Sequence, residues 1–143
     1  MRENKKGYEA VHIHNPREVY EFMKNLRHSD RERFYSLSLD AKNKVVNCEE
    51  VSCGSASSTS AHPREVFKSA ILSSSISVIL VHNHPSGDPT PSIEDEALIR
   101  RLYEAGELLG IDVLDSVIIG EDSYYSFKEA GKIGNYRGAK NHL

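Results

Sequence analysis

The sequence predicts a single mixed α/β domain, an α+β sandwich in which helices pack on a mixed sheet. Three observations predict it: short apolar or alternating runs typical of strands, longer stretches with helical spacing, and turn residues between them. A chain of 143 residues has room for one such core. We expect residues 1–14 to form a flexible N-terminal segment and residues 15–143 to form the domain.

The first part of the predicted domain is a helix followed by a hairpin. Asn15 suits the N-cap of this helix and Pro16 its first turn. The apolar side chains that follow at helical spacing are Val19, Phe22, Met23 and Leu26. Residues 34–39 alternate and predict a strand, residues 40–43 have turn chemistry, and residues 44 to about 52 return as the hairpin partner.

The second part is predicted to alternate helices and strands. Pro63 begins a helix, and the short apolar run 76–81 is typical of a central strand covered on both faces. Ser92 opens the longest helix, and Gly110 ends it. Residues 113–119 and 124–126 predict two further strands. The side chains expected to face the core from the two helices are Val66, Phe67, Ala70, Ile71, Ala97, Leu98, Leu102 and Ala105.

Composition excludes several classes of protein. No apolar run approaches the roughly 20 residues of a membrane helix, and no apolar stretch follows the basic N-terminal residues as in a signal peptide. We therefore expect a cytoplasmic protein without membrane association. The net charge of −3 gives no electrostatic case for DNA binding.

Cys48 and Cys53 fit neither a zinc knuckle nor a CxxC pair, so we expect buried or half-buried thiols.

The segment 82–95, HNHPSGDPTPSIED, carries the strongest chemical signal. His82 and His84 are two residues apart in a predicted strand end, so their side chains share one face with Cα atoms about 6.5–7 Å apart. Two imidazoles at that separation can bind one metal ion. The proline-rich loop limits the entropy cost of adding a third ligand, for which Asp95 is the candidate. Ser92 and Asp95 also fit plain helix capping, worth about 1 kcal/mol, but capping explains neither the histidine pair nor the loop.

Two histidines and one aspartate would leave one coordination position of zinc open to water, the pattern of catalytic zinc sites. Zinc lowers the pKa of a bound water toward neutrality. Hydrolysis then needs a carboxylate that accepts the proton and a donor that faces the developing oxyanion. The spacing alone leaves four candidate bases open: Glu32, Glu49, Glu50 and Glu65.

These residues carry a family resemblance. The pattern His82-x-His84-Pro85 followed by Ser92-x-x-Asp95 resembles the JAMM metalloprotease motif, and the run His-Asn-His-Pro-Ser-Gly-Asp-Pro is similar to its RadC branch. The resemblance spans residues 15–133, with further matching blocks at 61–68, 108–111, 114–115 and 125–127. It implies an MPN-type α/β fold, similar in layout to cytidine deaminase, with one catalytic Zn²⁺.

The resemblance also implies a role for each candidate residue. His82, His84 and Asp95 correspond to the zinc ligands, and Ser92 corresponds to the serine that stabilises the tetrahedral oxyanion. Glu32 precedes an alternating strand, as the JAMM glutamate does, and is therefore the implied base. His62 lies in a RadC block without an assigned role, and we consider it a candidate wall of the site.

Two features differ from the usual family pattern. RadC proteins usually carry an N-terminal helix–hairpin–helix segment expected to contact DNA, and these 143 residues leave no room for it. The chain therefore looks like a stand-alone RadC-like domain. The branch is named for DNA repair, whereas its motif implies hydrolysis of a peptide or isopeptide bond, and the two do not reduce to one activity.

Three interpretations follow. The leading one is a zinc-dependent metallohydrolase acting on a peptide or protein substrate. The second is a DNA-repair or mobile-element accessory protein with a structural or vestigial metal, which salt-dependent, chelator-insensitive DNA binding would support. The third is a metal-free scaffold with a satisfied histidine pair. A nucleotide deaminase is excluded because the chain lacks the Pro-Cys-x-x-Cys signature. Neither the substrate nor the oligomeric state is predicted.

Overall fold

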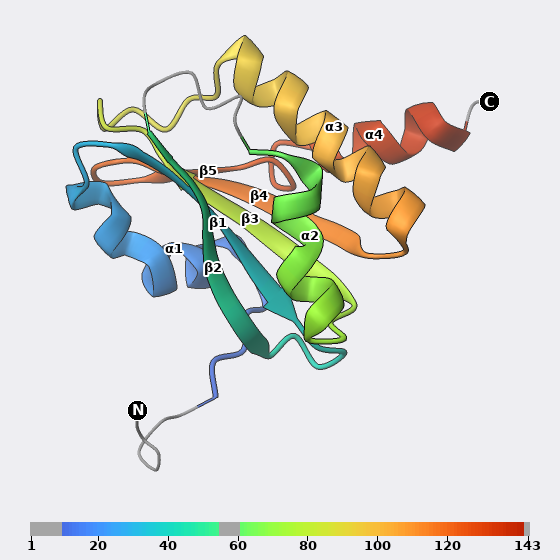
Figure 1. Cartoon of the computed structure of the whole chain (residues 1–143). Helices are drawn as coiled ribbons and strands as arrows, with labels where there is room; N and C mark the ends of the chain where they lie inside the picture. Colours follow the sequence, from blue (N-terminus) through green and yellow to red (C-terminus); the bar gives the residue numbers. More distant parts are fainter. Residues whose placement is uncertain (1–9, 55–60, 142–143) are drawn as a thin grey trace.

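A computed structural model describes residues 10–54 and 61–141 and contains one mixed sheet (Figure 1). The strands are β1 (Glu32–Leu39), β2 (Val45–Gly54), β3 (Ser77–Asn83), β4 (Asp112–Ile119) and β5 (Tyr124–Ser126). Their order across the sheet is β2-β1-β3-β4-β5. The β3–β4 pair is parallel, and the other neighbouring pairs are antiparallel. The predicted mixed α/β architecture is confirmed.

Helices cover both faces of the sheet (Figure 1). The helices are α1 (Pro16–Met23), the 3₁₀-helix η1 (Lys24–His28), α2 (Pro63–Leu72), α3 (Ile93–Leu109) and α4 (Lys132–Asn141). α1 lies on one face, whereas α2 and α3 lie on the other with α4 beside α3. Two separate apolar clusters fill the two layers, one beneath each set of helices.

The central strand β3 is buried at every residue, which confirms the prediction of a strand covered on both faces. It extends two residues beyond the predicted end, so His82 belongs to the strand itself. Gly110 ends α3 with a φ of 74°, a left-handed conformation that glycine adopts without steric cost. The β3–α3–β4 unit thus places the end of β3 close to the start of α3.

Several details of the helices differ from the predictions. The first helix changes to 3₁₀ geometry after Met23, and α4 was not predicted because its polar sequence has little amphipathic pattern. Three side chains expected in the core are exposed: Phe22, Ile71 and Ala97. α3 packs through a face rotated relative to the predicted one, which adds Ile99 and Tyr103 to the core.

The two cysteines are also more exposed than expected. Cys48 and Cys53 are free and exposed because both lie on β2, the edge strand of the sheet. Both are thiols as expected, and the prediction that they are buried or half-buried is wrong.

The boundary of the packed region lies earlier than residue 15. Residues 1–9 of the expected N-terminal segment lie outside the described residues, but Ile13 is buried in the layer beneath α1. Its backbone N–H donates to Asn43, and the Val11 carbonyl accepts from Val45. Most of the segment between β2 and α2 also falls outside the described residues. In the described parts, no helix is long and apolar enough to cross a membrane.

Candidate metal centre

Four predicted site residues converge from β1, β3 and α3. One ligand atom from each of Glu32, His82, His84 and Asp95 lies within 4.8 Å of those of the others. His84 Nε2 is 3.0 Å from Asp95 Oδ2, and His82 Nε2 is 3.4 Å from Asp95 Oδ1. Glu32 Oε2 lies 3.9 Å from His82 Nε2. Glu32, His82 and Asp95 are almost completely buried, and His84 is half-buried.

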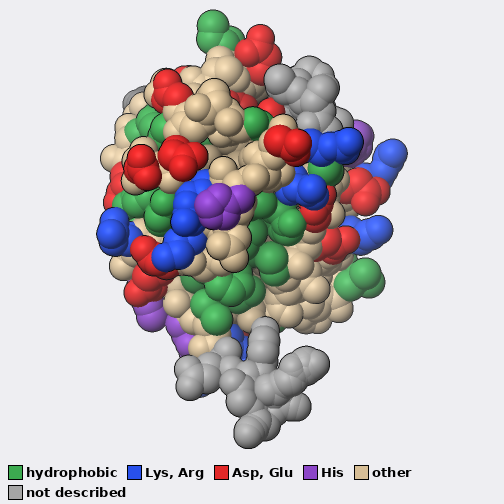
Figure 2. Space-filling model, turned by 90° about the vertical axis from the view of Figure 1, so that its left-hand side faces the viewer, with side chains coloured by type: hydrophobic (Ala, Val, Ile, Leu, Met, Phe, Trp, Pro, Cys, Tyr) green, Lys and Arg blue, Asp and Glu red, His purple; other side chains and the backbone are tan. Residues whose placement is uncertain are grey.

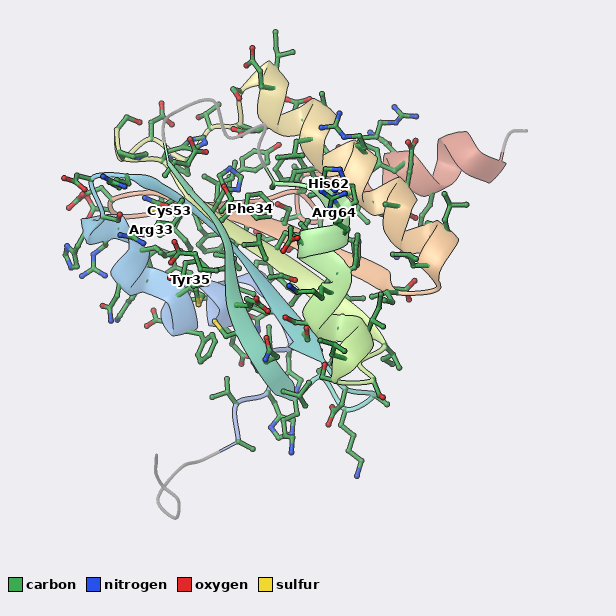
Figure 3. The ribbon with its side chains drawn as sticks, viewed as in Figure 1. Arg33, Phe34, Tyr35, Cys53, His62 and Arg64 are labelled. Carbon is green, nitrogen blue, oxygen red and sulfur yellow. The ribbon has the colours of Figure 1, made fainter. Side chains whose placement is uncertain are left out.

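The strand register brings Glu32 to the histidines. Phe34 pairs with His82 across β1 and β3, and side chains alternate between the faces of a strand. Phe34 and Tyr35 accordingly lie on opposite faces of β1 (Figure 3). Glu32, two residues before Phe34, therefore shares the face of His82. The Phe34 ring stacks on the His82 imidazole with centroids 5.3 Å apart, which limits the orientations open to that ring.

The loop after β3 orients His84. Gly87 has a φ of 91°, and its carbonyl accepts from the Glu121 backbone N–H in the β4–β5 turn. A Cβ atom at Gly120 would meet the Gly87 oxygen at 2.5 Å, so this close approach requires glycine there. Held in this way, the loop presents the Asp88 carbonyl to His84 Nδ1 at 2.9 Å. A carbonyl only accepts, so Nδ1 carries a proton and Nε2 faces the site.

Asp95 both caps α3 and faces the histidines. Its backbone N–H donates to Ser92 Oγ at 3.0 Å, and its Oδ2 accepts from the Ser92 backbone N–H at 2.9 Å. The plain capping arrangement therefore exists, in the form of a capping box. The same carboxylate is the closest acid to both imidazoles, so capping aims it at the site. Ser92 itself is exposed at the edge of this group.

The surroundings of Asp95 and His84 favour the charged forms of these two side chains. Burial alone would raise the pKa of Asp95, but the two histidines and the Ser92 N–H outweigh it and hold that pKa well below its ordinary value. Burial works against the charged form of His84 too, yet Asp95 and the Asp88 carbonyl raise its pKa overall. The pocket therefore favours a carboxylate facing positive charge.

Comparison with known proteins identifies the family to which this chain belongs. A family model described as a RadC-like JAB domain matches residues 13–132. The chain belongs to the RadC-like JAB domain family. It is 52% identical over 120 residues to a UPF0758 protein of Methanosarcina mazei, covering 83% of this chain and 52% of that protein. It is 56% identical over 111 residues to a UPF0758 protein of Desulforamulus reducens, covering 78% and 49%. The chain spans about half the length of the curated relatives it matches.

The donor set of this RadC-like domain fits a metal ion. Neither ring nitrogen of the buried His82 makes a hydrogen bond to any of the described residues, although two carboxylates lie within 4 Å of its Nε2. Since His84 Nδ1 is protonated, its Nε2 can approach a carboxylate at 3.0 Å only with a proton or a cation between them. Nitrogen and carboxylate oxygen atoms at these separations suit a tetrahedral site with bonds of about 2.0–2.2 Å.

The surroundings of the four candidate bases of the RadC-like domain differ, and they distinguish Glu32 from the other three. Glu32 alone among them belongs to the buried group of four. Glu50 accepts from Arg33 and from the Tyr35 hydroxyl, and Arg33 lies with Cys53 at the same end of the β1–β2 pair (Figure 3). Glu65 lies on α2, within 4 Å of Arg64 and Lys68 side-chain nitrogens, and Glu49 is a partly exposed residue of the edge strand.

His62 has a local structural role. It is the N-cap of α2, and its Nδ1 accepts from the Arg64 backbone N–H at 3.3 Å; both residues lie at the start of that helix (Figure 3). Sequence reasoning missed two contributors to the site, the Phe34 ring and the Asp88 carbonyl. The strand alternation could have placed Phe34 beside His82, but no sequence signal identifies which backbone carbonyl meets His84.

Proposed function

We propose that this RadC-like domain is a zinc-dependent metallohydrolase that cleaves a peptide or isopeptide bond. The observation that carries the proposal is the Glu32 carboxylate, buried 3.9 Å from His82 beside a donor set of two histidines and an aspartate. A buried acid next to ligand-type side chains is an arrangement suited to proton transfer. Membership of the RadC-like JAB domain family adds support.

In this proposal, His82, His84 and Asp95 hold the ion. Zinc bound there supplies an activated water and a Lewis acid for the carbonyl oxygen. Glu32 accepts the proton of the attacking water and returns it to the leaving amine. The Ser92 hydroxyl donates to the developing oxyanion; its oxygen already accepts from the Asp95 N–H, which leaves its own proton available.

The DNA-associated alternative has weaker support. The net charge is −3, and on the face shown in Figure 2 basic side chains are interspersed with acidic ones. A nucleic-acid footprint typically gathers Lys and Arg into a stripe or patch. Chelator-insensitive binding to branched or single-stranded DNA, weakening steeply with salt, would favour this alternative.

A peptide library tests the proposal. Zinc-loaded protein would be incubated with proteome-derived peptides and with peptides acylated on a lysine side chain, and new termini would be identified by mass spectrometry. Glu32→Gln would be compared with Glu65→Gln, a matched change at an exposed acid on α2. Zinc content would be measured by elemental analysis in every sample.

We expect cleavage by the parent and by Glu65→Gln. Loss of a general base typically costs 10²–10⁴-fold, so Glu32→Gln should lose at least about 100-fold in rate while retaining zinc. Equal rates for Glu32→Gln and the parent would contradict the role of Glu32. No cleavage by the zinc-loaded parent of either peptide class would contradict the proposed reaction.

A further inference from the structure

The β1–β3 ladder ends before it reaches Glu32. Phe34 and His82 form the last pair of this ladder, whereas β1 continues for two more residues. On its outer side, this end of β1 still pairs with β2, where Glu32 lies opposite Gly54. The backbone groups on its inner side need another source of hydrogen bonds, since buried N–H and C=O groups are rarely left unpaired.

The side-chain amide of Asn83 supplies these bonds. Its Oδ1 accepts from the Arg33 backbone N–H at 2.8 Å, and its Nδ2 donates to the Arg31 carbonyl at 2.9 Å. Asn83 is completely buried. The two backbone groups lie on either side of Glu32 in the chain, so one planar amide holds both flanks of the residue that carries the carboxylate.

We propose that Asn83 is a positioning residue for Glu32: its amide continues the ladder in place of the β3 backbone and holds the carboxylate beside the histidine pair. This inference rests on the proposed function, in which Glu32 is the base. Asn83 lies between His82 and His84 in the chain, so one short segment carries both the ligands and the clamp on Glu32. The 3.9 Å separation of Glu32 and His82 thereby depends on the connection that the Asn83 amide makes between β3 and the start of β1.

The arrangement explains why the residue is an asparagine. Its amide presents an acceptor and a donor in one plane, which matches the N–H of Arg33 and the C=O of Arg31. Aspartate has the same shape but would place a second acceptor against the Arg31 carbonyl. Alanine would leave both backbone groups without this partner.

The test compares Asn83→Ala and Asn83→Asp with the parent, with Glu32→Gln and with Ser126→Ala. Ser126→Ala is the matched control, because it also removes a buried hydrogen bond, the 2.6 Å bond to Asp115, outside the site. Each protein would be measured for zinc content, crystal structure of the zinc-loaded form, and hydrolysis of whichever peptide the library identifies. A fourth measurement is the pH profile of the visible spectrum after cobalt substitution.

We expect both Asn83 variants to retain stoichiometric zinc while the Glu32 carboxylate moves by about 1 Å or more. A displacement of that size can lower a rate by about 100-fold. The cobalt pH profile should shift toward that of Glu32→Gln. Ser126→Ala should change neither the carboxylate position nor the profile, because its effect is confined to stability.

A zinc-loaded Asn83→Ala structure with Glu32 in its original place would overturn the inference. The inference would also be overturned if Glu32→Gln shifts the pH profile of the cobalt spectrum and Asn83→Ala leaves that profile unchanged. Loss of zinc from both variants would also overturn it, since Asn83 would then support the ligands. If Asn83→Ala does not fold, the isosteric Asn83→Asp decides by the same measurements. Failure of the proposed function would be seen differently: Glu32→Gln would hydrolyse the peptide as fast as the parent. In that case the crystal structures would still show whether Asn83 holds Glu32 in place.

Discussion

Asp95 and Asp115 are both buried aspartates, but their surroundings differ. Asp115, on β4, receives three hydrogen bonds: from the Ser116 and Lys128 backbone N–H groups and from the Ser126 hydroxyl. Among the described residues, Asp95 accepts one backbone hydrogen bond, from the Ser92 N–H, and otherwise faces two imidazoles. Burial raises the pKa of Asp115 despite its three donors, whereas the histidines lower that of Asp95.

The difference distinguishes a structural carboxylate from a ligand-type carboxylate. The donors to Asp115 come from β4, β5 and the turn after β5, so the side chain joins these segments and needs nothing more from outside the fold. Around Asp95, the neighbouring His82 has no hydrogen bond to the described residues. An unsatisfied buried polar group costs about 1–3 kcal/mol, and a bound cation would remove that cost.

The largest expected effect is on zinc affinity. Asp95→Asn should weaken zinc binding by more than about 100-fold, because loss of a ligand should exceed the 10–100-fold cost of losing an outer partner. Asp115→Asn should leave zinc affinity unchanged. Competition with a chromophoric chelator measures both. Equal affinities for the two variants would remove the distinction between the aspartates.

The next effect is on stability. Asp115→Asn should lower the free energy of unfolding by about 1–3 kcal/mol, because the amide has a single oxygen. Either the Ser126 hydroxyl or the two backbone N–H groups would then lose their acceptor. Urea unfolding of the chelator-treated protein measures this change. An unchanged midpoint would show that Asp115 does not join β4 to β5 as described.

The two aspartates should also respond to pH in opposite directions in the metal-free protein. The lowered pKa of Asp95 contributes stability that is present above the ordinary carboxyl value of 3.8 and is lost as the pH falls. The raised pKa of Asp115 contributes stability that is present below that value and is lost as the pH rises through the raised pKa. Between pH 6 and 3, the destabilisation by Asp95→Asn should shrink and that by Asp115→Asn should grow, by at most about 1.4 kcal/mol per pH unit. Parallel trends in urea unfolding would contradict the assignment.

The smallest expected effect on stability concerns the helix start beside Asp95. Ser92→Ala removes the acceptor for the Asp95 N–H and should lower the free energy of unfolding by about 1 kcal/mol. Ser92→Thr keeps a hydroxyl at this position and should retain most of that stability. In the proposed reaction Ser92→Ala should also lower the rate by 10²–10³-fold. A loss of stability with full activity would restrict Ser92 to capping.

The convergence of His82, His84 and Asp95 could be predicted from the sequence because these residues are close in the chain. His82 and His84 share a strand face by alternation, and the capping pattern places Asp95 one turn into a helix. Glu32 came from the family resemblance, since it reaches the site through a strand register that no local pattern encodes. The clamp by Asn83 was missed for the same reason: its partners lie 50 and 52 positions away.

The sequence likewise predicted part of the fold and missed the rest. Strands with strong alternation or apolar runs were found, and β3 was correctly placed at the centre. The inward face of α3 was partly wrong because Ala97 and Ala105 carry little hydrophobic signal, so small rotations of the helix are not distinguished. α4 packs through Ile133 and the half-buried Tyr136, too few apolar side chains to show a helical period.

The origins of the four convergent side chains have a consequence for evolution. Three of them come from one stretch that closes on itself through a short loop, and the fourth comes from the opening strand of the sheet. Under the proposed mechanism, catalysis can therefore be lost in evolution while metal binding is retained. A descendant with altered residues around position 32 could persist as a metal-carrying but inert protein, whereas damage to the 82–95 stretch would abolish both properties at once.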